Sequence, residues 1–450
     1  MRFRSFELAM SACLCGTLLV ACADGGSSAT RAAGALPAGG QSAVAHVPGG
    51  GVRRPQSAPT CSAIGSGSFI GGGVGNVAAA DDSAVLGGDG NEVCENVSSI
   101  AGGIANIISS GGNNVSTVSF IGAGQQNTIT GGAAFGFIGS GSGNKLTGET
   151  GAIVGGNENQ NAGTNAAVGA GESNTIGANA TDGFIGGGSA NSVVAQYSVI
   201  AGGLNNNVSG EGGYIAAGGY NTLSGIGAVI DGGFNNTAAG DYGTIPGGYV
   251  NSAAGIYSFA AGARASAAQT GSFVWSDGSD GDAILTATRA YQFLARASGG
   301  FTLWTNAAST VGATLAPGSG TWASASDRNM KTDVVRVDDA AVLDKIASLP
   351  INRWSYITER GVRHVGPMAQ DFYAAFGVGA DDKHITSIDE DGVALAAIKA
   401  LHARVGVLDA ENASLRAQLA AQKASQARHD LLVDRELQRL SAVVSVSRER

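Results

Sequence analysis

A serine and a lysine stand five residues apart where the composition of the chain changes, and this pair could cleave a peptide bond. A serine hydroxyl is a weak nucleophile until a base takes its proton, and a desolvated, neutral lysine can be that base. Ser326 and Lys331 would lie roughly 140° apart around a regular helix. They can therefore meet only if Ser326 lies in the turn before a helix. Asp327 could orient that turn or cap the helix. Most serine and lysine residues this close are solvated surface, so the pair alone is weak support for a self-cleavage site.

The two sides of this junction differ in composition. The upstream part is repetitive and rich in glycine, and the downstream part is rich in charge and ends in a heptad pattern. The 450 residues include 73 Gly and 8 Pro, without the Gly-X-Y period of collagen, and the net charge is −9. Between Cys61 and Ala265 the basic residues are Lys145 and Arg264. Binding a nucleic acid requires a basic surface, so we expect no nucleic-acid partner.

Residues 1–22 read as an export signal. Arg2 and Arg4 begin it, and the apolar stretch that follows is too short for a membrane span. It ends in the sequence LVAC, which resembles the bacterial lipobox and implies lipidation at Cys22. The alternative is an ordinary secretory signal. We expect an exported protein that is anchored by its lipid in the outer membrane or at the cell surface. Residues 23–60 are Ala, Gly, Ser and Pro without periodicity, which predicts a flexible tether.

Two cysteines follow the tether, in what would be an oxidising compartment. Cys61 and Cys94 could form a disulfide that staples the start of the repeats, or remain two buried thiols. No His, Cys, Asp or Glu residues show the spacing of metal ligands, and several Gly-x-Gly-x-x-Gly matches lack the βαβ context of a dinucleotide site. We expect neither a metal nor a cofactor.

Residues 61–265 repeat, mostly with a period of 15 and with a few intervals of 17 or 21. The anchors are asparagines at positions 76, 91, 106, 127, 144, 159, 174, 191, 206, 221, 236 and 251. Six residues before each anchor stands an isoleucine or a valine, and an apolar residue usually follows two positions after it. This pattern predicts two short strands per coil of a parallel β-solenoid, with an internal ladder of Ile and Val. Glycine pairs would make the tight turns, and we expect the anchor asparagines to adopt left-handed geometry and to bond their own backbone.

Each coil would hold only two or three apolar side chains, so we expect neighbouring chains to cover it. Residues 198–203 (SVIAGG) and 213–218 (GYIAAG) resemble the β-roll repeats in the heads of trimeric autotransporter adhesins, in which three chains wind side by side. Members of that family end in a membrane β-barrel, and this chain does not, so we expect the lipid to be its anchor instead. Residues 266–325 lose the period and predict a short β-rich neck. Trp275, Trp304 and Trp322 could stack on carbohydrate there, or be core or trimer contacts.

The segment from 326 to 450 predicts a small α+β domain. Residues 342–349 and 370–376 show helical spacing, residues 354–362 suggest a hairpin, and another helix begins near Gly392. With Ser326, Lys331 and the sequence HVGPMAQD from His364, this closely resembles the endosialidase-type intramolecular chaperone of phage tailspikes. The resemblance implies that three such domains hold three chains together during folding. Ser326 would then attack the bond after Ala325 with Lys331 as base, acting only in cis. His364 could shape that site, or be a structural hydrogen-bonding histidine.

The last helix carries a heptad seam that fits a trimer. Its apolar positions predict a coiled coil whose Asn412 would fix the register, against the alternative of one amphipathic helix folded on its own domain. The seam consists of Ile398, Leu401, Val405, Leu408, Asn412, Leu415 and Leu419. We therefore expect a homotrimeric, adhesin-like or structural surface protein whose host or glycan ligand the sequence does not name. One alternative is a phage-like glycan-binding or glycan-degrading protein, which paired carboxylates in a groove would favour. Another is that the serine–lysine pair is silent and the C-terminal segment only trimerises the chain.

Overall fold

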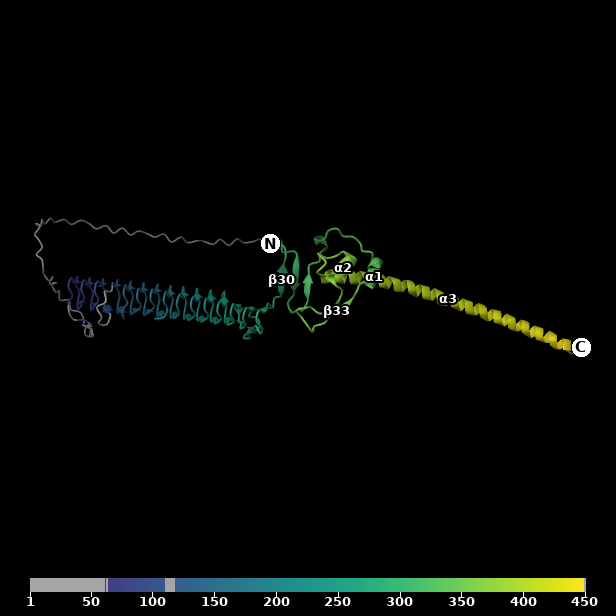
Figure 1. The fold of residues 1–450 in the computed structure, drawn as a ribbon, viewed down its shortest axis with the longest axis horizontal. Helices are drawn as coiled ribbons and strands as arrows, with labels where there is room; N and C mark the ends of the chain where they lie inside the picture. The colour runs from purple at the N-terminus through teal and green to yellow at the C-terminus, as the bar shows by residue number, and fades with distance from the viewer. Residues whose placement is uncertain (1–60, 62–63, 110–117, 449–450) are drawn as a thin grey trace, which may run out of the picture. The chain divides into compact units, whose positions relative to one another are not determined.

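The computed structural model describes residue 61 and residues 64–109 and 118–448. The chain divides into two compact units, with the boundary after Ala323. The first unit is a parallel β-solenoid and the second is a small α+β domain with a long helix, so the mainly-β fold class predicted from the repeats is confirmed (Figure 1). Among the described residues no helix has the length and apolar character that crossing a bilayer requires.

Two parallel sheets run along the solenoid, and each coil adds one strand to each sheet. The first sheet has 15 strands and the second has 14. The first sheet comprises β1 (Phe69–Ile70), β3 (Ala84–Val85), β5 (Ser99–Ile100), β7 (Phe120–Ile121), β9 (Phe137–Ile138), β11 (Ala152–Ile153), β13 (Ala167–Val168), β15 (Phe184–Ile185), β17 (Val199–Ile200), β19 (Tyr214–Ile215), β21 (Val229–Ile230), β23 (Thr244–Ile245), β25 (Phe259–Ala263), β27 (Phe273–Asp277) and β29 (Phe293–Arg296).

Along the chain, strands of the second sheet alternate with strands of the first. It comprises β2 (Val77–Ala78), β4 (Glu92–Val93), β6 (Ile107–Ser109), β8 (Thr128–Thr130), β10 (Lys145–Leu146), β12 (Gln160–Asn161), β14 (Thr175–Ile176), β16 (Ser192–Val193), β18 (Asn207–Val208), β20 (Thr222–Leu223), β22 (Thr237–Ala238), β24 (Ser252–Ala253), β26 (Ala265–Ala267) and β28 (Leu285–Thr286).

The strands stay in register where the repeat length varies. Ile70 pairs with Val85, 15 residues on, and Ile100 pairs with Ile121, 21 residues on. The register is preserved because a shift of one residue within a strand would turn its core side chain to the solvent.

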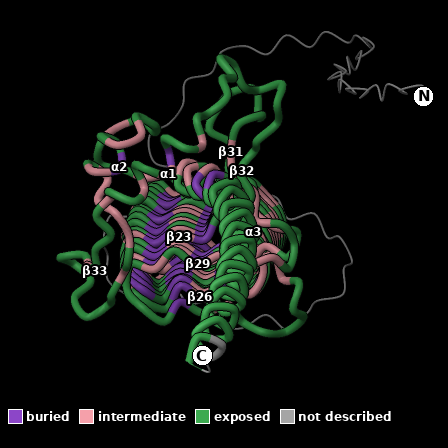
Figure 2. The backbone as a smooth tube through the Cα atoms, turned by 90° about the vertical axis from the view of Figure 1, so that its right-hand side faces the viewer, coloured by how far each residue is buried: buried purple, intermediate pink, exposed green. Residues whose placement is uncertain are grey.

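The core is the ladder that the 15-residue pattern predicts. Nearly every coil sends one apolar side chain inward from each sheet, such as the fully buried Ile200 and Val208; in β12 the inward residue is Asn161. Figure 2 shows the buried positions as bands that follow the inside of the coils. The alternate residue of each strand faces outward, which is why two-residue strands suffice to separate core from surface.

The anchor asparagines form a second, polar ladder. Asn191 Nδ2 donates to the carbonyls of Gly187 and Gly203 and to Asn174 Oδ1, at 2.9 to 3.1 Å, and its Oδ1 accepts the N–H and Nδ2 of Asn206. Every polar atom of this fully buried side chain is therefore satisfied. The expectation that the anchors themselves are left-handed is wrong. The residue before each anchor takes that geometry, so that the amide side chain can turn inward and bridge three coils.

The left-handed corners carry side chains that such a backbone disfavours. Val250 has φ 54°, whereas at the corresponding corner three repeats earlier Asn205 has φ 55°. A β-branched side chain is strained there and an asparagine is tolerated. We expect Val250→Asn to raise the free energy of unfolding by about 1 kcal/mol. The reciprocal Asn205→Val should lower it by a similar amount in denaturant unfolding, and equal effects of the two substitutions would contradict the strain argument.

The parallel stacking continues past residue 265, where the repeat pattern stops. Phe259, Phe273 and Phe293 pair across β25, β27 and β29 at intervals of 14 and 20 residues. The last anchor, Asn251, accepts the N–H of Ala265, and no asparagine takes its place in the next coil. The rings of the three phenylalanines, at the outward positions of the first sheet, stack with centroids 4.5 and 4.7 Å apart. The amide ladder thus ends at Asn251, while an aromatic ladder on the outer face of the first sheet continues past it.

The end of the solenoid also carries a charged cluster and a small antiparallel sheet. The N–H of Ser298 donates to the Asp277 carboxylate and holds its pKa well below its usual range, and Arg296 contacts both Asp277 and Asp280. The antiparallel sheet comprises β30 (Phe301–Trp304), β31 (Gly312–Leu315) and β32 (Trp322–Ser324). Trp275, Trp304 and Trp322 are all exposed within a single chain.

The second unit contains the helices and the hairpin that its sequence predicts. Its elements are the 3-10 helix η1 (Arg328–Met330), α1 (Asp339–Ser348), β33 (Asn352–Trp354), β34 (His364–Gly366), α2 (Ala369–Phe376) and α3 (Ser387–Arg448). The strands pair antiparallel, and α1 packs on α3. Val342 of α1, Phe372 of α2 and Ala397 and Ala400 of α3 are the buried apolar residues of this unit. The long helix begins five residues before Gly392, because the Thr386 hydroxyl accepts the N–H of Asp389 and caps it.

Candidate active site

Ser326 and Lys331 meet in the structure. Lys331 Nζ donates to Ser326 Oγ over 2.7 Å. Ser326 lies before the turn, as the angular argument requires, but the turn is the short 3-10 helix η1 rather than an α-helix. Asp327 caps it, because its Oδ1 accepts the N–H of Asn329 at 2.9 Å and the Asn329 side chain at 3.1 Å. This cap holds the backbone so that the lysine side chain folds back over the serine.

The pair has the geometry of a nucleophile and its base. An amine within 2.7 Å of the hydroxyl needs no further movement to take its proton. The amine must first be neutral, and burial is what favours the neutral form of a lysine. Both side chains are exposed in a single chain. A single chain therefore brings the two side chains into contact, but it leaves the lysine amine exposed to solvent.

His364 belongs to the hairpin. Its ring stacks on Trp354, directly across from it in β33, at 4.7 Å between centroids, and meets Tyr356 edge-on at 5.5 Å. Its Nε2 lies 3.5 Å from a carboxylate oxygen of Glu359, which is long for a hydrogen bond. These contacts are those of a residue that packs the hairpin, and the structure does not join it to Ser326 by a hydrogen bond.

The two cysteines at the start of the solenoid are joined. Cys61 and Cys94 form a disulfide with a Cα–Cα distance of 5.8 Å, and Glu92 Oε1 accepts the N–H of Cys61 at 2.8 Å. Within the described residues these three side chains are the one group close enough to hold a metal together. A thiolate is the metal-binding form of cysteine, and both sulfurs are occupied by the bond between them. Cys22 and the predicted export signal and tether, residues 1–60, lie outside the described residues.

The part of the second unit that carries the serine and the lysine has a known counterpart. Residues 326–378 match the family model described as "Chaperone of endosialidase". The resemblance seen in the sequence from Ser326 onward is thereby confirmed for this segment. The endosialidase-chaperone segment includes the Ser326–Lys331 contact, α1, the hairpin and α2. No curated protein matches the chain. The likeness of the repeats to adhesin heads stays a prediction.

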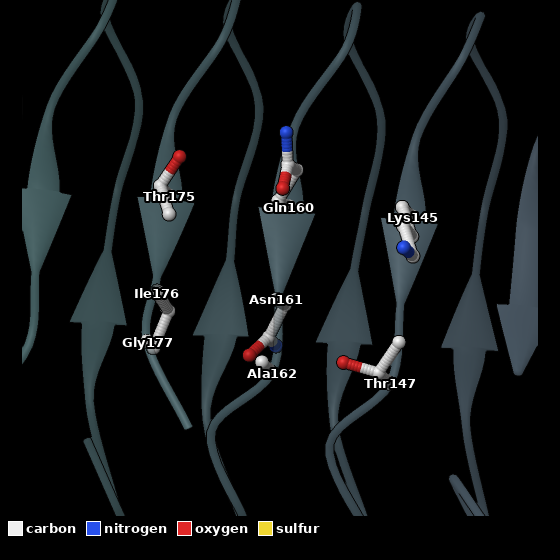
Figure 3. A pocket seen from close by; sticks show the side chains of 8 residues that line it. All are labelled: Lys145, Thr147, Gln160, Asn161, Ala162, Thr175, Ile176 and Gly177. Atoms are coloured by element: carbon white, nitrogen blue, oxygen red, sulfur yellow. The ribbon is translucent and has the colours of Figure 1, made fainter. Parts of the chain in front are cut away.

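One feature of the solenoid surface was not predicted from the sequence. Lys145, one of two basic residues in the repeats, lines a hollow on the outer face of the second sheet (Figure 3). The signal that could have found it is the row of small residues Ala162 and Gly177, which align two positions after Gln160 and Thr175 in consecutive coils.

Proposed function

We propose that the endosialidase-chaperone segment and α3 gather three chains while the solenoid folds, and that Ser326 then cleaves the chain before itself. The observation that carries this proposal is the 2.7 Å contact between Lys331 Nζ and Ser326 Oγ inside the matched segment. Slow, non-local β-pairing is exposed to aggregation, so a temporary folding aid has a physical purpose here.

The cleavage is an acyl transfer within one chain. Lys331 takes the proton of Ser326 Oγ, and the oxygen attacks the carbonyl carbon of Ala325. The bond between that carbon and the Ser326 nitrogen breaks, and the nitrogen takes a proton and becomes an amine. Water then hydrolyses the ester between Ala325 and the serine oxygen. The products are a chain that ends at Ala325 and a fragment that begins at Ser326.

The long helix supports assembly of several copies. α3 has 62 residues and a length of about 90 Å. Every side chain from Leu401 to Val444 is exposed in a single chain, including the seam residues Val405, Leu408 and Leu415. A helix that packs only near its start gains little from tertiary contacts, and a heptad seam gains them from copies of itself.

The two faces of the solenoid differ in a way that also supports assembly. The outer face of the first sheet exposes large apolar rings, among them Phe120, Phe137 and Phe184. The outer face of the second sheet exposes polar residues, among them Gln160 and Thr222. We infer that the first face lies against the other two chains of a homotrimer, because a row of exposed aromatic rings is typical of an interaction surface.

The oligomeric state tests this part of the proposal. In the Ser326→Ala background, light scattering should give the mass of three full-length chains. Leu401→Asp with Leu408→Asp places charges in the seam and should reduce the mass to that of one chain. Ala403→Asp with Ala410→Asp adds the same charges on the opposite side of α3 and should leave the trimer intact. A single-chain mass without any seam substitution would refute the assembly.

The matured solenoid would act as an adhesive or structural rod at the cell surface, held by a lipid at Cys22. Removal of the segment that nucleated the trimer would make its stability kinetic, since unfolding could no longer be reversed. A glycan-binding protein of the phage-tailspike kind is the second candidate, and the hollow beside Lys145 is the observation that favours it.

A further inference from the structure

The outer face of the second sheet has a hollow of about 250 Å³ over β10, β12 and β14. Lys145, Gln160 and Thr175 align across these three strands and form one side of it. Figure 3 shows their side chains in one row, with Thr147, Ala162 and Gly177 two positions further along the strands, beyond Asn161 and Ile176. The hollow therefore has polar groups along one edge and small residues on its floor.

The fold does not require this hollow. In the row formed by Thr147, Ala162 and Gly177, the side chain becomes smaller from one coil to the next. A Cβ placed on Gly177 would meet no atom closer than 3.4 Å, and its backbone is not left-handed, so a larger residue would fit. Asn161 lies beneath the floor in a row that otherwise holds Leu146 and Ile176, and its amide donates to the carbonyls of Ala152 and Ala166.

Lys145 gives the hollow a positive charge, whereas the charged residues of the repeats around it are mostly acidic. Residues 61–265 contain 12 acidic residues and two basic ones. The other basic residue, Arg264, is paired with Asp282 and lies over the ring of Tyr249. Among the described residues, no ion pair within 4.0 Å involves Lys145. A cation without an ion pair, among the acidic residues of this part of the rod, is a place where a carboxylate would be attracted.

We propose that this hollow binds a carboxylate-bearing sugar residue of an acidic polysaccharide. The ammonium of Lys145 pairs with the carboxylate, and the Thr147 and Thr175 hydroxyls and the Gln160 amide bond to sugar hydroxyls. The ring lies on the apolar floor of Ala162 and Gly177. This inference deepens the glycan-binding candidate and does not depend on the cleavage. It uses the face that the proposed trimer leaves open.

The probes that test the site are glucuronate and glucose, which differ by the carboxylate. Calorimetric titration of the full chain at low ionic strength should give a glucuronate Kd in the millimolar range. Glucose and acetate should each bind at least tenfold more weakly, because each lacks half of the contacts. Added salt should weaken glucuronate binding, as it does any exposed ion pair.

Three variants connect the binding to these residues. Lys145→Gln removes the charge and Ala162→Leu fills the floor, and each should weaken glucuronate binding at least tenfold. Thr222→Val lies on the same face three coils beyond Thr175 and should leave the Kd unchanged. Equal binding of glucose and glucuronate, equal binding of acetate and glucuronate, or unchanged binding by Lys145→Gln would each overturn the proposal. These outcomes do not depend on whether the chain cleaves itself, so a failure here is separable from a failure of maturation.

Discussion

Ser326→Ala should leave the expressed chain as one full-length band on a denaturing gel, whereas the wild type separates into two fragments. The substitution removes the attacking oxygen and leaves the rest of the turn intact, since the cap is made by Asp327. Lys331→Ala should give the same single band. Lys331→Arg is the sharper variant, because an arginine can donate to Ser326 Oγ but stays charged at any accessible pH and cannot take the proton. We expect each of the three to reduce the cleaved fraction from near completion to none.

The control for these variants lies in the same turn. Asp327→Asn keeps an oxygen that can accept the N–H of Asn329, so the cap and the cleavage should persist. Cleavage that survives Ser326→Ala, or that proceeds with arginine at position 331, would remove the serine–lysine mechanism. Loss of cleavage in Asp327→Asn would show that the carboxylate does more than shape the turn.

Asn191→Asp should disrupt the solenoid. The amide nitrogen of Asn191 donates to three oxygens, those of Gly187, Gly203 and Asn174 Oδ1. A carboxylate of the same shape would turn an acceptor toward three acceptors and bury a charge. The expected loss is about 3 kcal/mol or more of unfolding free energy, as for a buried polar group left without partners. Denaturant unfolding followed by circular dichroism measures it.

Asn207→Asp provides the matched comparison. Asn207 lies one residue after the anchor Asn206 and is exposed on the outer face of the second sheet. The chemical change is identical, and we expect an effect within about 0.5 kcal/mol of zero. If both substitutions had the same small effect, the amide ladder would not be what holds successive coils together.

Much of the solenoid could be predicted because its signals are periodic. Alternation within each strand fixes which side chain is buried, and the 15-residue spacing of the anchors fixes which residues stack. The geometry of the corners could not be predicted in the same way. Asparagine is suited both to a left-handed backbone and to side-chain bonding, and only the structure shows that the preceding residue, such as Asn205, takes the first role. The coils beyond residue 265 could not be predicted because the asparagine ladder ends at Asn251 and Ala265 stands in the place of the next anchor.

The candidate site was predictable in part for a steric reason. Two side chains five residues apart cannot meet on a regular helix, so Ser326 was expected in the turn before one. Aspartate is a common capping residue, which suggested the role of Asp327. The role of His364 depends on the register of the hairpin. That register sets His364 opposite Trp354, and no spacing in the sequence reveals it. The hollow beside Lys145 depends on which small residues align across coils, so it becomes visible only once the strands are paired.

Native mass spectrometry of the purified wild-type protein detects assembly and cleavage together. We expect an assembly of three chains that each end at Ala325, and a released fragment whose first residue is Ser326. A folded, uncleaved single chain as the main species would contradict both the assembly and the cleavage.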